Sequence, residues 1–192
     1  SQVSVSPGAA TNFPAGRADS AGVPEVLPST VLIAPYNDLE TTHKIVEENR
    51  QNMACVIVEP VAGNMGCVPP EPGFLEGLRE LCDRAGTLLI FDEVSTGFRP
   101  TAAGVQPLVG VTPDMAVFAK SISNGYAMGA VVGRRDVMAP AEQMFVSSTY
   151  WGEAVGLAAA VATLTELRKR NTSETLARNG ASLKERLNGV AA

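Results

Sequence analysis

The stretch Thr87-Leu88-Leu89-Ile90-Phe91, followed directly by Asp92 and Glu93, decides the fold of this chain. A continuous apolar and β-branched run of this length, without polar alternation, is typical of a strand buried on both faces of a parallel sheet. Two more runs have the same form and also stop at a charged residue. They are Ala54–Val58 before Glu59 and Met115–Ala119 before Lys120.

The segments between these runs have helical periodicity. In Gly73–Ala85 the apolar residues recur at helical spacing, and Gly86 is a typical stop signal. Strands that alternate with helices predict an α/β fold with a mostly parallel sheet flanked by helices. Ligands bind such sheets outside the carboxyl ends of the strands, so the charged residues there are candidates for a site. The other expected elements are a helix at 41–52, a short strand at 130–132, a long helix at 152–170 and a helical tail at 171–192.

Composition restricts the class of protein. The chain has 192 residues, of which 45% are hydrophobic, a net charge of -5 and a pI near 4.9. This is enough apolar material for one core, and the acidic balance argues against a nucleic-acid or anionic-membrane surface. The three cysteines form no CxxC pair and His43 is the single histidine, so we expect no metal site. We interpret Cys55 and Cys82 as reduced core thiols in a cytoplasmic protein.

The first 35 residues are rich in Ser, Pro, Gly and Ala, which favours an extended arm that leads to one short strand at Val31–Ala34. There is no basic segment followed by an apolar one at the start of the sequence, and no apolar run of about 18 residues. We therefore expect neither a signal peptide nor a membrane span.

Three motifs surround the charged strand ends, in this order along the chain. They are VEPVAGNMG at Val58–Gly66, FDEVSTGFR at Phe91–Arg99 and VFAKSISNG at Val117–Gly125. Together they resemble the class III aminotransferases, and most closely the glutamate-1-semialdehyde aminomutase-like branch. PYNDL at Pro35–Leu39 and GRRDVM at Gly133–Met138 resemble the same branch, so the similarity extends from about residue 15 to about residue 170.

The resemblance implies an incomplete large domain of the fold type I transferases that depend on pyridoxal 5'-phosphate (PLP). Its function would be the transfer or migration of an amino group. Lys120 would bind the cofactor's aldehyde as a Schiff base, and Asp92 would pair with the pyridine nitrogen, so that the protonated ring acts as an electron sink. Taken singly, an aspartate after a strand is usually a turn or cap residue and a lysine there a solvated charge. The three ordered motifs favour the catalytic interpretation.

Four other residues receive roles from the resemblance. Val94 would pack on the ring face, and Asn64 would lie near the ring hydroxyl. Glu59 would organise the residues around the cofactor, or, alternatively, cap a neighbouring backbone group at the strand end. Thr149, in the SSTY segment, would donate to the phosphate of a partner subunit's PLP, which implies a homodimer. Thr149 could also cap the helix that we expect near Gly152.

The chain departs from the pattern in several places. Family members are about twice this length, and we find no Gly-rich phosphate cup before the first strand, no aromatic residue for the outer ring face and no small C-terminal domain. We therefore expect a lead-in arm at 1–35, a partial PLP-binding domain at 36–170 and the start of a connection to a missing domain at 171–192. The glycine run that we associate with the aminomutase is absent after Lys120, which leaves mutase or transaminase activity open.

Two alternatives to an active enzyme remain at this point. The first is a catalytically incomplete fragment or relative that acts only as a dimerising α/β domain. The second is a nucleotide-binding domain, for which the sequence lacks both a GxGxxG and a GxxxxGK[ST] loop. For the enzyme, we expect a small amino acid, amino aldehyde or keto compound as substrate.

Overall fold

The computed structural model describes residues 5–6, 14–18, 20–24 and 26–191. Two compact units make up the chain. The first comprises the residues up to Ala54 together with Glu71–Thr87, and the second comprises Cys55–Pro70 together with the chain from Leu88 onward. The chain therefore enters the second unit, returns to the first for one helix, and enters the second again.

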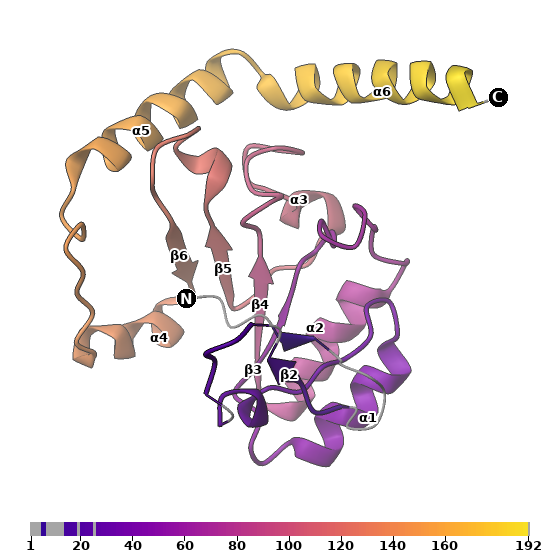
Figure 1. Cartoon of the computed structure of the whole chain (residues 1–192), viewed down its shortest axis with the longest axis vertical. Helices are drawn as coiled ribbons and strands as arrows, with labels where there is room; N and C mark the ends of the chain where they lie inside the picture. Colours follow the sequence, from indigo (N-terminus) through magenta and orange to yellow (C-terminus); the bar gives the residue numbers. More distant parts are fainter. Residues whose placement is uncertain (1–4, 7–13, 19, 25, 192) are drawn as a thin grey trace. The chain divides into compact units, whose positions relative to one another are not determined.

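In the described part of the first unit, the α-helices are α1 (Leu39–Asn49) and α2 (Phe74–Ala85), and β1 (Val5–Ser6) pairs antiparallel with β2 (Arg17–Ala18) (Figure 1). Asp38 caps α1, because its Oδ1 accepts from the Thr41 N–H at 2.9 Å and its Oδ2 from the Thr41 hydroxyl at 2.6 Å. These hydrogen bonds lower the pKa of the Asp38 carboxyl.

The two helices pack closely, and a glycine permits the contact. A Cβ on Gly77 of α2 would lie 2.2 Å from Cδ2 of Leu39, so a larger residue there would force the Leu39 side chain to move. Gly86 ends α2 in the left-handed conformation, with φ 72°, as the sequence predicted. The buried side chains of the pair are Ile45 and Val46 of α1 and Phe74, Leu75, Leu78, Leu81 and Cys82 of α2.

A four-stranded sheet forms the centre of the second unit (Figure 1). The strands predicted at 54–58, 87–91, 115–119 and 130–132 are present and are neighbours in the order β3-β4-β5-β6. The pairs β3·β4 and β4·β5 are parallel, and β6 is antiparallel to β5, which confirms a mostly parallel sheet. The bounds are Cys55–Val58 for β3, Leu88–Asp92 for β4, Met115–Phe118 for β5 and Ala130–Gly133 for β6.

The burial of β3 differs from the prediction. Cys55 is exposed and Ile57 is 61% exposed, so this strand is not buried on both faces. β4 is buried on alternate residues only, with Leu89 and Phe91 at 0% exposure. The reason is that β-branched apolar residues report a preference for extended backbone, whereas burial depends on which layers cover the strand. Of the two cysteines interpreted as core thiols, only Cys82 is buried.

Asp114 links the amino end of β4 to the residue that follows β6. Its Oδ2 accepts from the Leu89 N–H at 2.7 Å, and its Oδ1 accepts from the Arg134 guanidinium at 2.7 Å. Asp114 is only 3% exposed, so this ion pair ties the start of β4 to the residue that follows β6. Arg134 also pairs with Asp136, which lowers the pKa of the Asp136 carboxyl. The GRRDVM motif is therefore structural at this position.

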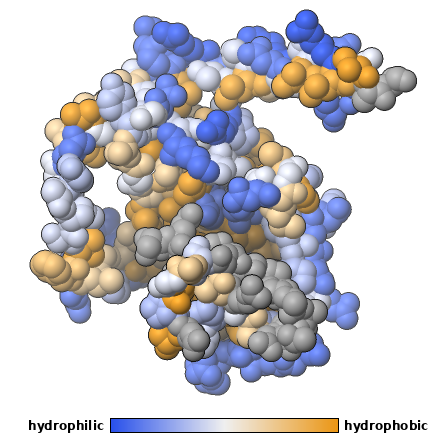
Figure 2. Space-filling view, viewed as in Figure 1, coloured by the Kyte–Doolittle hydropathy of each residue, from blue (hydrophilic) through white to orange (hydrophobic). Residues whose placement is uncertain are grey.

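The remaining helices of the second unit are α3 (Gln106–Val109), α4 (Arg135–Met138), α5 (Ala154–Lys169) and α6 (Thr172–Ala191). Glu153 caps α5, because its carboxylate accepts from the N–H groups of Val155 and Gly156. The alternative that Thr149 caps this helix is therefore wrong, since the helix begins further along than expected. Apolar side chains lie in a row along α6 (Figure 2), and those that are exposed are Leu176, Leu183, Leu187 and Val190.

The expected strand at Val31–Ala34 is reduced to one isolated antiparallel bridge between Ala15 and Leu32, preceded by a 3-10 helix at Pro28–Thr30. Four apolar residues alone do not recruit a second strand there. Within the residues that the structure describes, no helix has the length and hydropathy needed to cross a membrane.

Candidate active site at the carboxyl ends of the strands

Asp92 is the last residue of β4 and lies opposite Val117 of β5. Its side chain is half-buried, and its Oδ1 accepts a hydrogen bond from the Val94 N–H at 2.9 Å. Among the described residues nothing donates to its Oδ2. One oxygen therefore fixes the carboxylate and the other remains able to accept a hydrogen bond from a bound molecule.

Lys120 follows β5 by two residues and opens a short 3-10 helix, Lys120–Ile122. Its φ of 47° lies in the left-handed region, which costs a residue with a Cβ about 1–3 kcal/mol, and such strained residues cluster at functional sites. Its Nζ donates to the Ser95 hydroxyl at 2.6 Å. No carboxylate of the described residues pairs with it, so a neutral group holds this amine.

The loop after β3 reaches the same place. Glu59 Oε2 accepts from the Gly63 N–H at 3.0 Å, which closes a tight turn. A Cβ on Gly63 would lie 3.3 Å from that oxygen and 3.8 Å from the Ser95 Cβ, so the loop after β3 contacts the loop after β4 here. Because Ser95 also contacts Lys120, residues that follow all three parallel strands meet around Ser95. This bond from the Gly63 N–H agrees with the alternative interpretation of Glu59, in which the carboxylate caps a backbone group.

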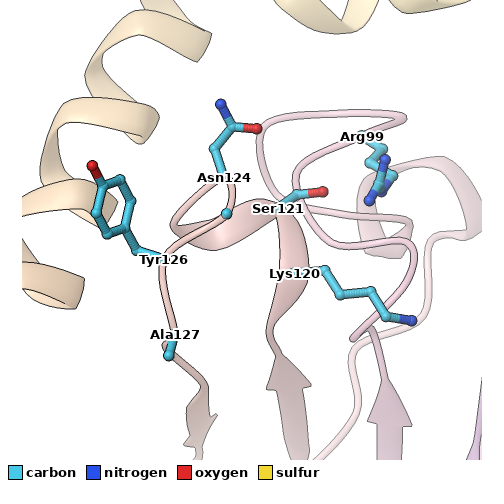
Figure 3. Close-up of a pocket in the computed structure, with 7 residues that line it drawn as sticks. Arg99, Lys120, Ser121, Asn124, Tyr126 and Ala127 are labelled. Carbon is cyan, nitrogen blue, oxygen red and sulfur yellow. The ribbon is translucent and has the colours of Figure 1, made fainter.

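An open cavity of about 580 Å³ lies beside Lys120. Figure 3 shows Arg99 and Lys120 on the side of Ser121 that is opposite to Tyr126. Asp92, Glu59 and Val94 do not line this cavity, so the structure does not bring all the predicted side chains into one hollow. The lining residues are Arg99, Lys120, Ser121, Asn124, Gly125, Tyr126 and Ala127.

A second cavity, of about 590 Å³, shares Arg99 with the first and is more apolar. Gly63 and Ser95 line it, so the Lys120–Ser95 hydrogen bond joins residues of the two cavities. The apolar walls include Val61, Val105 and Leu108. Lys120 therefore lines the more polar cavity, and its hydrogen-bond partner Ser95 lines the more apolar one.

The structure places the other predicted residues at the edges of this region. Val94 is half-buried and lies two residues after Asp92, the last residue of β4. Asn64 is exposed, in a turn where the N–H groups of Gly66 and Cys67 both donate to Gly63 O. Thr149 is exposed and makes no contact with Lys120 or Asp92 among those that the structure gives.

Glu93 holds the loop that carries Ser95 and Arg99. It is 0% exposed, and its Oε2 accepts from the Val105 N–H at 2.8 Å and from the Thr96 hydroxyl at 3.1 Å. Its Oε1 accepts from the Gln106 amide at 3.0 Å. Gly104 is required beside it, because a Cβ there would lie 2.1 Å from Oε2. The buried carboxylate therefore closes both ends of the loop at 93–106.

We expect Glu93→Gln to lower the free energy of unfolding by about 1–3 kcal/mol, because an amide can accept at only one atom and would direct its own N–H groups at buried donors. A urea titration of the variant measures this change. Glu76→Gln on the exposed surface of α2 is the matched control. Equal unfolding midpoints for the two variants would mean that the hydrogen bonds of Glu93 contribute nothing to the free energy of unfolding.

Sequence reasoning missed four residues of the site: Ser95, Arg99, Asn124 and Tyr126. All except Tyr126 lie inside the quoted motifs, and Tyr126 follows the third motif directly. The signal was their position within two loops that both follow strand ends. Side-chain type gave no indication, because serine, asparagine and arginine are ordinary loop residues.

Comparison with known proteins identifies relatives of this chain. The family model "Aminotransferase class-III" matches residues 3–192. The glutamate-1-semialdehyde 2,1-aminomutase 2 of Brevibacillus brevis is 47% identical over 175 residues, which are 90% of this chain and 41% of that protein. The glutamate-1-semialdehyde 2,1-aminomutase of Myxococcus xanthus is 48% identical over 160 residues, 82% of this chain and 37% of that protein.

A solved structure, described as a transaminase with PLP bound, matches with a TM-score of 0.73 and 32% identity, over 79% of this chain and 37% of that one. The chain thus spans about two fifths of the length of the curated relatives. The fold class predicted from the three motifs is confirmed. The family model covers nearly all of the sequence, and the chain belongs to the class-III aminotransferases.

Proposed function

We propose that the protein uses PLP to transfer or migrate an amino group, with Lys120 as the residue that binds the cofactor covalently. The observation that carries the proposal is the Lys120 amine, at the end of a parallel strand, held by a neutral hydroxyl in a strained backbone conformation. The names of the relatives support it, since they are an aminomutase and a transaminase with PLP bound.

The residues present fit the cofactor. An amine that attacks an aldehyde must not be locked in an ion pair, and the Ser95 hydroxyl leaves the Lys120 Nζ available. A partner for the pyridine nitrogen must offer a carboxylate oxygen, and Asp92 Oδ2 has no other donor among the described residues. When bound, PLP supplies an electron sink for the carbanion formed at the substrate carbon.

Each residue then has a task of its own. Asp92 holds a proton at the ring nitrogen through its charge, and the Val94 N–H keeps the carboxylate in place. Val94 would supply apolar surface to the ring, and Asn64 would supply an amide to the ring hydroxyl, as the family resemblance implies. Glu59 keeps the loop that carries Asn64 closed through its bond to Gly63.

Lys120 also moves the proton. With the cofactor bound, the Lys120 Nζ would be the group that takes a proton from the α-carbon of the substrate and later gives it back, as a general base and acid. The Ser95 hydroxyl accepts from this Nζ and so limits the directions in which the amine points. A small amino acid, amino aldehyde or keto compound is the substrate that this chemistry needs.

The test is a covalent label. The full-length protein is mixed with PLP, reduced with borohydride and digested, and the peptides are weighed. The expected result is one phosphopyridoxyl group on the peptide that contains Lys120. A label on another lysine such as Lys44 would refute the assignment. Absence of any label would favour the alternative, a catalytically incomplete relative that acts only in dimerisation.

A second assay separates mutase from transaminase. A mutase converts glutamate-1-semialdehyde without a second substrate, whereas a transaminase requires an amino donor and a keto acceptor. The two relatives named as aminomutases favour the first outcome. The product mixture with and without an added keto acid decides between the two activities.

We also propose a homodimer in the cytoplasm, in which residues 36–170 form the PLP-binding domain. The segment around Thr149 supports a partner surface, because large apolar side chains there are left in solvent. They are Met144 at 64%, Phe145 at 98%, Tyr150 at 79% and Trp151 at 68% exposure. The cytoplasm is supported by three cysteines that are all free thiols.

If Thr149 donates to the phosphate of the partner subunit's cofactor, Thr149→Ala should weaken PLP binding by about tenfold or more, because a hydrogen bond to a charged group is lost. Thr149→Ser should restore it, and Thr112→Ala at an exposed loop position is the control. Equilibrium dialysis measures the affinity, and light scattering measures the mass of the same sample. A monomer that is fully active would contradict the assembly.

A further inference from the structure

The lining of the cavity beside Lys120 is positively charged, although the chain as a whole is acidic. The sequence carries 20 acidic and 15 basic residues, yet of the described residues that line the cavity two are cationic and none is acidic. The other polar lining groups are the Ser121 hydroxyl, the Asn124 amide and the Tyr126 phenol, all of which can donate hydrogen bonds. Such a lining suits an anion.

Arg99 is the cationic lining residue to which the proposed function gives no role. It is exposed, and within the described part of the chain no carboxylate pairs with its guanidinium. Its backbone is held in place, because the Arg99 N–H donates to Thr96 O at 3.2 Å and Thr96 is bonded to the buried Glu93. An unpaired guanidinium that is carried by a fixed backbone beside a cavity is well placed to bind an oxyanion.

We propose that Arg99 binds an oxyanion, which is either the carboxylate of the substrate or the phosphate of the cofactor, while Lys120 is engaged covalently. This inference rests on the proposed function, since it places the anion next to the residue that reacts. Asn124 and Tyr126 add neutral donors on the other side of the cavity (Figure 3). Both anions present oxygen pairs that a guanidinium can bind with two parallel hydrogen bonds.

The first test needs neither PLP nor turnover. The full-length protein is treated with phenylglyoxal, which modifies arginine, in the presence of inorganic phosphate or acetate, and the modified peptides are quantified. Modification of Arg99 should fall several-fold with one of these anions. Arg135, an exposed arginine of α4 outside the cavity, is the internal control and should stay unchanged. Equal modification of Arg99 with and without both anions would overturn the proposal.

The second test distinguishes the two anions with Arg99→Gln and the control Arg135→Gln. A phosphate site predicts a roughly 10- to 100-fold weaker affinity for PLP and an unchanged affinity for pyridoxal, which lacks the phosphate. A carboxylate site predicts unchanged PLP affinity and a KM raised by a similar factor for an amino acid, but not for an amine without a carboxylate. If neither parameter changes, the proposal is wrong.

The failure of this inference and of the proposed function can be told apart. If the wild-type protein forms no covalent link with PLP, the proposed function fails while the phenylglyoxal result still decides whether Arg99 binds an oxyanion. If the link forms at Lys120 and Arg99→Gln leaves both affinities unchanged, the proposed function stands and the oxyanion site falls.

Discussion

Lys120→Ala in the full-length protein should abolish the covalent attachment of PLP and reduce turnover by at least about 10²- to 10⁴-fold. The larger part of the reason is that one amine performs two tasks. It forms the bond to the cofactor's aldehyde, and it carries the proton between carbon atoms, a step for which general acid-base catalysis alone contributes a factor of that size. The backbone strain at φ 47° remains in the variant, because alanine has the same Cβ as lysine.

Borohydride reduction followed by peptide mass analysis measures the first effect, and steady-state kinetics measures the second. Lys44→Ala, an exposed lysine of α1, is the matched control and should behave like the wild type. A borohydride-stable PLP adduct that persists in Lys120→Ala would mean that another lysine binds the cofactor. The assignment of the whole site would then fall with it.

Asp92→Asn should leave PLP bound but reduce turnover by roughly a hundredfold or more. The amide keeps the shape of the side chain and the bond that its oxygen accepts from the Val94 N–H. It removes the charge that holds a proton at the ring nitrogen, so the developing carbanion is less stabilised. Loss of a half-buried charge partner is worth on the order of 3 kcal/mol, which corresponds to about a hundredfold in rate.

The measurement compares kcat with the PLP dissociation constant for Asp92→Asn and for Asp83→Asn, an exposed control on α2. The expected pattern is a large fall in kcat with a much smaller change in cofactor affinity. An equal loss in both would indicate that Asp92 serves mainly to shape the pocket. An unchanged kcat would show that another group holds the ring proton.

The sequence alone predicted the elements of the sheet well, and the reason lies in local chemistry. Three apolar runs gave β3, β4 and β5 as neighbours, because parallel strands joined by helices leave few arrangements. It predicted burial less well. Cys55 and Ile57 belong to an apolar run and are nevertheless exposed. Such a run indicates a preference for extended backbone, but it does not tell which elements will cover the strand.

For the site, the sequence by itself determined the residue types and their order: a carboxylate after β4, an amine after β5 and a glycine turn after β3. Only the tertiary structure decided which of them meet. It showed that Ser95 contacts Lys120, that the buried Glu93 holds the loop at 93–106 and that Arg99 lines the cavity. The physical reason is that strand periodicity fixes where a loop begins, whereas the direction of each side chain within the loop depends on hydrogen bonds between residues distant in sequence.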